Sequence, residues 1–122
     1  MEIQRQFYLD ELLRKQGNGF VKIITGLRRC GKSYLLRTIF KNHLLANGTA
    51  PEEIVEMAFD ERDNKKFRDP DLFYEFAKEK LAQHPDTIFL LDEIQLLGDF
   101  ESVLNGLLGK NAEIYATGSN AK

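Results

Sequence analysis

A glycine-rich segment between an apolar run and a helix-like run constrains this chain more than any other feature. Gly26-Leu27-Arg28-Arg29-Cys30-Gly31-Lys32-Ser33 fits the spacing G-x-x-x-x-G-K-[ST]. The β-branched run at 20–25 precedes it, and apolar residues at helical spacing follow it. In this context a loop turns successive backbone N–H groups toward an anion at the N-terminus of the helix. The motif therefore predicts a cradle for the phosphates of a nucleotide.

Each residue of the motif has an expected part in that cradle. Gly26 and Gly31 permit the backbone angles, Lys32 reaches the β- and γ-phosphates, and the Ser33 hydroxyl ligates Mg²⁺. Cys30 contributes mainly backbone, although positive potential in the loop would favour a reactive thiolate. The residues expected to bind nucleotide are Gly26, Leu27, Arg28, Arg29, Cys30, Gly31, Lys32, Ser33 and Tyr34.

Hydrophobic periodicity predicts helices that alternate with strands. We expect helices at 3–16, from the loop to Asn47-Gly48, from Asp69-Pro70 to His84, and at 100–108, with strands at 20–25, 54–59, 87–91 and 113–117. The helix after Asp69 should bury Leu72, Phe73, Phe76, Ala77 and Leu81, and Asp99 should cap the last helix. Residues 60–68 are expected to form a solvated charged loop. This alternation predicts an α/β fold of three layers, with a mostly parallel sheet and helices on both faces.

A second constellation follows the strand at 87–91, where four apolar residues lead into Asp92-Glu93. A charge at the rim of a core is costly unless it is solvated, paired or metal-bound. Beside a phosphate loop, Asp92 is expected to hold the Mg²⁺ that Ser33 also ligates, and Glu93 to polarise an attacking water. Taken alone, the pair would be read as a solvated turn or a helix cap.

The segment Gly118-Ser119-Asn120 follows the last predicted strand. Ser119 or Asn120 is expected to hydrogen-bond the γ-phosphate or the water, and a simple Gly-Ser-Asn turn is an equal alternative. The phosphate loop, Asp92-Glu93 and Ser119-Asn120 all fall at the carboxyl ends of strands, where ligands of parallel sheets bind.

Length and charge restrict the class of protein. The 122 residues, 43% of them hydrophobic, suit one domain, in which 1–19 form a helix and linker and 20–122 form the nucleotide-binding core. No apolar run approaches the ~20 residues of a membrane span, and we expect a cytoplasmic protein. Residues 1–41 carry nine Lys/Arg against three Asp/Glu, whereas 42–122 carry eight against sixteen. The basic part suits a triphosphate, and a DNA surface is the weaker explanation.

The base of the nucleotide has one indirect signal. Asn64-Lys65-Lys66-Phe67 matches only the first half of the guanine-reading pattern N-K-x-D, because Phe67 stands where the aspartate would be. Adenine is therefore the expected base, which makes ATP the expected nucleotide.

These motifs together resemble those of prokaryotic predicted ATPases of the AAA-related type, in which a P-loop domain is usually followed by a nuclease-like C-terminal region. The resemblance is carried by residues 24–33, 91–95 and 117–120. It implies the strand order 2-3-4-1-5. The fifth strand, the helical lid and a trans-acting arginine are missing, so we expect this chain to be the N-terminal part of a longer protein.

The leading hypothesis is Mg²⁺-dependent binding and hydrolysis of ATP. The alternative is a nucleotide-gated module for a protein or DNA partner with little or no hydrolysis, and a small-molecule kinase is a third reading. The strand at 20–25, at an edge of such a sheet, is also expected to favour self-association.

Overall fold

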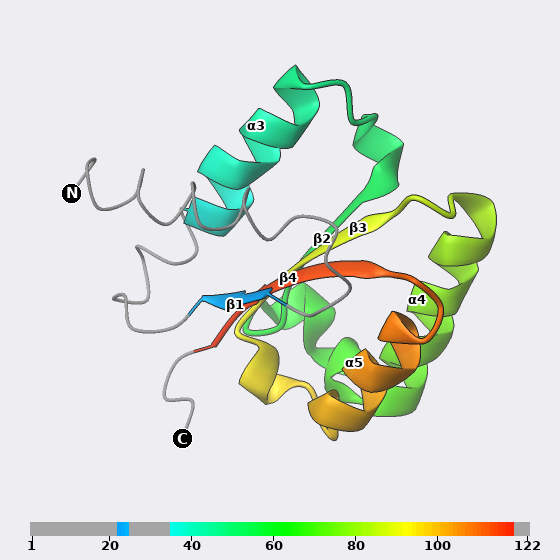
Figure 1. The fold of residues 1–122 in the computed structure, drawn as a ribbon. Helices are drawn as coiled ribbons and strands as arrows, with labels where there is room; N and C mark the ends of the chain where they lie inside the picture. Colours follow the sequence, from blue (N-terminus) through cyan, green and yellow to red (C-terminus); the bar gives the residue numbers. More distant parts are fainter. Residues whose placement is uncertain (1–21, 25–34, 119–122) are drawn as a thin grey trace.

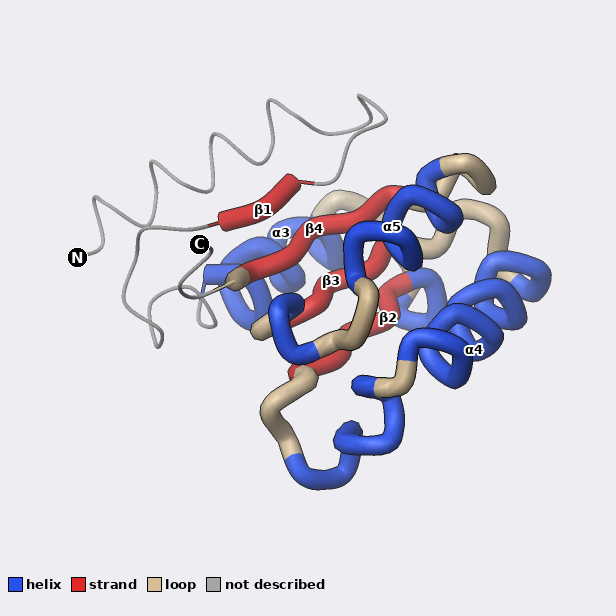
Figure 2. Tube along the Cα trace, turned by 90° about the horizontal axis from the view of Figure 1, so that it is seen from below, coloured by secondary structure: helices blue, strands red, loops and turns tan. Residues whose placement is uncertain are grey.

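A computed structural model describes residues 22–24 and 35–118 of the chain. Within these ranges four strands form one sheet, with α3 on one face and α4 and α5 on the other (Figures 1 and 2). In chain order the segments are β1 (Lys22–Ile24), the π-helix η1 (Leu35–Phe40), α3 (Lys41–Ala46), the 3₁₀ turn η2 (Pro51–Glu53), β2 (Ile54–Ala58), the 3₁₀ segment η3 (Arg62–Arg68), α4 (Pro70–Gln83), β3 (Ile88–Asp92), the 3₁₀ turn η4 (Ile94–Leu96), α5 (Phe100–Leu108) and β4 (Glu113–Thr117).

The sheet has the order β1-β4-β3-β2, and each pairing is parallel. β4 thus lies between the strand that leads into the phosphate loop motif and the strand that ends at Asp92, as the resemblance implied. The predicted α/β fold, with helices on both faces of a parallel sheet, is confirmed. The predicted helix at 3–16 lies outside the described residues.

Alternate residues of the central strands point to different helices, as a sheet covered on both faces requires. On one face Tyr115 packs against Phe40 of η1, with ring centroids 4.5 Å apart. On the other, Phe89 and Ile114 belong to a core shared with α4 and α5. Phe89, Leu90 and Leu91 have no exposed surface, which confirms the prediction of a strand buried on both sides.

Among the described residues, Tyr115 is the tyrosine that is buried. Burial raises its pKa well above the usual value, and the hydrogen bond that its hydroxyl donates to Glu113 raises it further. The ring therefore stays neutral, and its only polar atom is satisfied inside the sheet.

The predicted ends of α3 and α4 are confirmed. α3 stops at Asn47 and Gly48, and Gly48 has a φ of 101°, which glycine adopts without strain. The Asp69 side chain accepts from the N–H groups of Asp71 and Leu72 at 2.8 and 3.3 Å, and the helix ends before His84.

One predicted core position in α4 is wrong. Phe73, Ala77 and Leu81 are buried, but Leu72 is 50% exposed. The three buried residues recur at i, i+4 and i+8 and so define one line along the helix. Leu72 lies one residue from that line, about 100° around the axis, and faces solvent.

The prediction of a plain loop at 60–68 is also wrong, because residues 62–68 wind into 3₁₀ turns. Two side chains tie this segment to the end of β2: Asn64 donates to the carbonyl of Ala58 at 3.0 Å, and Arg68 to that of Phe59 at 2.8 Å. Phe67 packs on Phe76 of α4 with ring centroids 5.0 Å apart. Short i→i+3 turns with one partly buried aromatic give no helical periodicity that could be recognised in so polar a sequence.

The last helix has the predicted bounds and apolar face, but the predicted side-chain cap by Asp99 is wrong. Val103, Leu104 and Leu107 are buried, whereas the Asp99 side chain makes no capping hydrogen bond and its φ is 50°. Gly106 marks the close approach of α5 to α4, since a Cβ there would lie 3.0 Å from the Tyr74 ring. The glycine that weakens α5 as an isolated helix therefore makes room for the helix packed against it.

Candidate functional site

The carboxyl ends of the four strands meet at one edge of the sheet. The strand register pairs Ala58 with Asp92 and Ile24 with Thr117. One residue past the pair Leu91–Ala116, Asp92 and Thr117 face each other across β3 and β4. This edge is where parallel sheets bind ligands.

The phosphate loop motif is joined to described elements at both of its ends. β1 ends at Ile24, two residues before Gly26 in the sequence, and η1 begins at Leu35. The expected binding residues Gly26, Leu27, Arg28, Arg29, Cys30, Gly31, Lys32, Ser33 and Tyr34 themselves lie outside the described residues, as do Ser119 and Asn120.

Asp92 and Glu93 are both described, and both are buried, at 2% and 4% exposure. The Thr117 hydroxyl donates to Asp92 Oδ1 and accepts the backbone N–H of Glu93 at 3.0 Å. Glu93 Oε1 accepts from the Gln95 side-chain amide at 2.7 Å. The four residues Asp92, Glu93, Gln95 and Thr117 are called the edge cluster below.

The backbone of Glu93 has φ 58° and ψ 54°, the left-handed conformation. For a residue with a Cβ this conformation costs about 1 kcal/mol or more. It turns the chain out of β3 into η4 directly after the second carboxylate, and it is held by the hydrogen bond to Thr117. Asp92 and Glu93 are therefore the end of a buried strand and a strained turn, rather than a solvated loop.

A second cluster of charged side chains joins η1 and α3 to β2. Glu56 accepts from Arg37 and from Lys41, each at 2.7 Å, and Arg37 also reaches Glu61 at 3.2 Å. These four residues are called the ion-pair cluster below. They tie the helix that follows the phosphate loop motif to the edge strand β2.

The pKa of Glu56 reflects that pairing. Partial burial alone would raise it, but the hydrogen bonds from Lys41 and Arg37 outweigh burial, and the pKa lies below the usual 4.5. The hydrogen bond to Glu56 in turn raises the pKa of Arg37. Both shifts favour the charged forms of Glu56 and Arg37.

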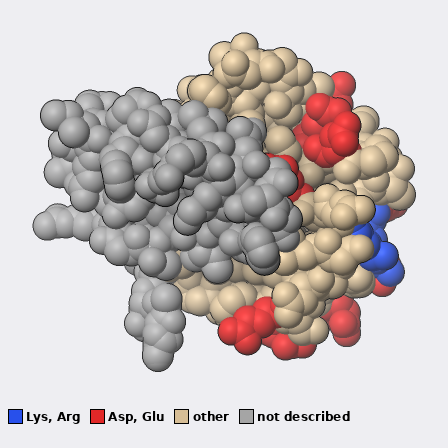
Figure 3. Space-filling view, viewed as in Figure 1, with Lys and Arg blue, Asp and Glu red and all other residues tan. Residues whose placement is uncertain are grey.

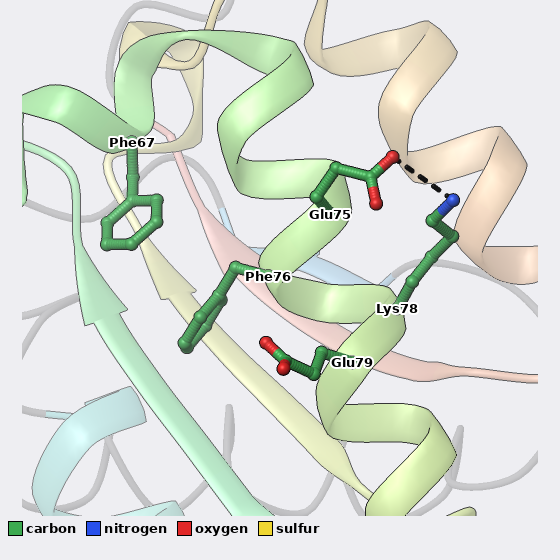
Figure 4. A pocket seen from close by; sticks show the side chains of 5 residues that line it. All are labelled: Phe67, Glu75, Phe76, Lys78 and Glu79. Atoms are coloured by element: carbon green, nitrogen blue, oxygen red, sulfur yellow. Dashed lines mark ion pairs between the residues drawn. The ribbon is translucent and has the colours of Figure 1, made fainter.

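An open hollow elsewhere on the surface is lined by Phe67, Glu75, Phe76, Lys78 and Glu79 (Figure 4). Lys78 and Glu75 form an ion pair of 3.1 Å across its rim. All five residues belong to η3 and α4, so the hollow is separate in sequence from the edge cluster and contains none of its carboxylates.

No group of three or more His, Cys, Asp or Glu side chains in the described part of the chain is placed to hold a metal ion. Asp92 is the carboxylate at the carboxyl edge that ends a buried strand, and it would need further oxygen ligands, one of which the Ser33 hydroxyl of the motif was expected to supply.

None of the described helices is long and apolar enough to cross a membrane.

Sequence reasoning assigned no role to Thr117 or Gln95, although both lie in the segments that carried the family resemblance. A signal for Thr117 existed: it is a hydroxyl residue at the last position of a strand that is otherwise apolar at its end. Its partner could not be named from the sequence, because Asp92 lies 25 residues earlier and is reached only through the strand register.

Comparisons with known proteins agree with this architecture. Residues 18–122 match a family model described as an AAA domain. An uncharacterized protein of Haemophilus influenzae is 35% identical over 121 residues, which are 98% of this chain and 30% of that protein. The chain thus spans less than a third of the length of this relative. No solved structure matches. On the family match, the chain belongs to the AAA domain family, whose members are ATP-binding domains of the ATPase type.

Proposed function

We propose that this domain binds Mg-ATP at the carboxyl edge of its sheet and hydrolyses it. In this proposal Lys32 and the loop backbone hold the phosphates, Ser33 and Asp92 hold the metal, and Glu93 activates water. Ser119 or Asn120 contacts the γ-phosphate or that water.

The observation that carries the proposal is the buried pair Asp92-Glu93 at the end of β3. Two adjacent carboxylates at 2% and 4% exposure are expensive to desolvate unless they are paired or metal-bound, and the proposal gives them a bound ion and a reactant to serve. They lie on the strand next to β4, and β4 pairs with the strand that leads into the G-x-x-x-x-G-K-S motif two residues later. The strand that leads into the motif and the strand that ends at Asp92 thus both pair with β4, which supports a shared site.

The donor chemistry at this edge fits Mg²⁺, which prefers carboxylate, hydroxyl and water oxygens. When bound, the ion would neutralise charge on the β- and γ-phosphates. Asp92 is suited to ligate it because Thr117 already fixes one of its oxygens. Glu93 is suited to take a proton from water because its carboxylate is buried and oriented by Gln95.

Adenine is the proposed base. The half-match to a guanine-reading motif ends at Phe67, and that ring packs on α4 as part of η3. The packing of Phe67 on α4 therefore explains this residue without a role in reading the base.

A nucleotide-gated interaction module with little hydrolysis remains the alternative. The matched segment is 30% of the relative from Haemophilus influenzae. In this alternative the domain acts together with a further region, such as the nuclease-like one that the family resemblance implies. DNA is the less favoured partner of this domain. On the described part of the face in Figure 3, acidic groups occur in several places and basic groups gather at one side.

Self-association is a further part of the proposal. β1 is at one end of the strand order within the described residues, and an edge strand offers backbone groups to a second copy. A monodisperse monomer in light scattering at high protein concentration would contradict it.

The proposed function is tested by calorimetric titration with Mg-ATP, Mg-ADP and Mg-GTP, combined with a phosphate-release assay. We expect adenine nucleotides to bind, Mg-GTP to bind more weakly, and Lys32→Ala to bind neither. At 100 times its dissociation constant, Mg-ATP should also raise the free energy of unfolding by about 2.7 kcal/mol. Binding without phosphate release would favour the gated module, and no binding by the folded protein would refute the proposal.

A further inference from the structure

Thr117 forms a hydrogen bond with each of the two acidic residues of the edge cluster. It ends β4, has no exposed surface, and uses both capacities of its hydroxyl. The O–H donates to Asp92 Oδ1, and the oxygen accepts the N–H of Glu93 at 3.0 Å. One side chain of β4 therefore contacts both residues that end β3.

The contact with Asp92 fixes the orientation of that carboxylate. The Thr117 hydroxyl has a single proton, and it donates a hydrogen bond to Oδ1. Because the carboxylate is planar, this bond also restricts the direction of its second oxygen. A metal ligand whose direction is set by a hydrogen bond binds its metal more tightly than one free to rotate.

The contact with Glu93 acts on the backbone. The left-handed turn at Glu93 is strained, and such a turn persists only where its surroundings determine it. By accepting the Glu93 N–H, Thr117 helps to hold the turn from which the carboxylate extends. A change at the end of β4 would thus alter the metal ligand and the general base together.

We propose that Thr117 is a positioning residue that holds Asp92 and Glu93 in register for the Mg²⁺-dependent step, and that this role depends on its hydroxyl rather than on its packing. This inference rests on the proposed function, because it assigns Thr117 a part in the same site. Thr117 itself is not a catalytic residue in this account.

A matched pair of variants separates the hydroxyl from the shape of the side chain. Thr117→Val keeps the shape and removes the hydroxyl, whereas Thr117→Ser keeps the hydroxyl and removes a methyl group. Thr87→Val is the control: Thr87 is also buried, and its hydroxyl donates to the carbonyl of His84 at 2.5 Å, before the other end of β3.

The readouts are kcat, KM for ATP, and the Mg²⁺ concentration for half-maximal ATP binding and turnover. We expect Thr117→Val to lower kcat and to raise the Mg²⁺ requirement, each by about 10-fold to 100-fold, with KM for ATP at saturating Mg²⁺ changed far less. Thr117→Ser should restore most of both values. Thr87→Val should lower the melting temperature without changing the Mg²⁺ requirement.

Two outcomes would overturn the inference while leaving the proposed function intact. One is a Thr117→Val protein with the kcat and Mg²⁺ requirement of the unmodified protein. The other is a Thr117→Ser protein as impaired as Thr117→Val, which would mean that packing matters and the hydroxyl does not. If Thr117→Val does not fold, Thr117→Ala replaces it under the same criteria. Failure of the unmodified protein to bind Mg-ATP would instead overturn the proposed function and this role with it.

Discussion

The edge cluster and the ion-pair cluster hold their carboxylates at different depths in the protein. In the ion-pair cluster, Glu56 is 21% exposed and accepts from two cations, so its charge is balanced where it stands. In the edge cluster, Asp92 and Glu93 are 2% and 4% exposed. The carboxylate of Asp92 accepts from the Thr117 hydroxyl, and that of Glu93 accepts from the Gln95 amide.

We interpret the first as a structural carboxylate and the second as one that serves the proposed site. The first joins a helix to the strand β2 and needs no ligand to explain it. The second is buried beside the predicted phosphate site, where the proposed function gives it a bound ion to hold. We therefore expect changes in the two clusters to affect different measurements.

The largest expected effect comes from Glu93→Gln. The amide keeps the size of the side chain but cannot take a proton from water, so turnover should fall by at least about 100-fold. Mg-ATP binding, measured by calorimetry, should stay within a few-fold of that of the unmodified protein. Glu56→Gln is the matched control and should keep its turnover. Equal turnover in Glu93→Gln would remove Glu93 from the mechanism.

Gln95→Ala should have a smaller effect of the same kind. It removes one hydrogen bond from a neutral amide to the Glu93 carboxylate, worth about 1.5 kcal/mol, which corresponds to a roughly tenfold loss of kcat. The Mg²⁺ requirement should not change, because Asp92 keeps its contact with Thr117. Steady-state kinetics at several Mg²⁺ concentrations would check this, and a shift in the Mg²⁺ requirement would contradict the assignment.

Glu56→Gln should have the smallest effect, on stability rather than turnover. Because the pairs with Arg37 and Lys41 are partly exposed, their loss should lower the free energy of unfolding by only about 1 kcal/mol at neutral pH. The folded-state pKa of Glu56 lies below 4.5, so this stability is present above that pH and is lost as pH falls through the lower folded-state value.

Urea denaturation of the unmodified protein and of Glu56→Gln from pH 7 to pH 3 would measure this contribution to the free energy of unfolding. The two free energies of unfolding should converge at the acidic end. A difference that persisted unchanged at pH 3 would mean that the pairing of Glu56 is not its source.

The sequence predicted the strands of this fold better than its irregular segments. The prediction for β4 is confirmed at both ends and that for β3 differs by one residue, because each is an apolar run between turn residues. Leu72 was assigned to the core although it lies beside the buried line of α4, and the 3₁₀ turns at 62–68 left no periodic signal.

The candidate site could be predicted only where its pattern is local. The motif at 26–33 and the pair Asp92-Glu93 are runs of adjacent residues with known chemistry, so their roles could be proposed at once. The hydroxyl of Thr117 meets Asp92 only through the pairing of β3 with β4. The left-handed turn at Glu93 is held in part by the hydrogen bond from its N–H to Thr117, and glutamate is not a residue type that favours it.

The most direct test of the central claim is the effect of Mg²⁺ on ATP binding to the unmodified protein and to Asp92→Asn. We predict that in Mg²⁺ the unmodified protein binds ATP at least about 10-fold more tightly than Asp92→Asn, and that in excess chelator the two bind it equally. Equal affinity of the two proteins for ATP in Mg²⁺ would contradict the account, because Asp92 would then be a buried carboxylate without a part in a metal site.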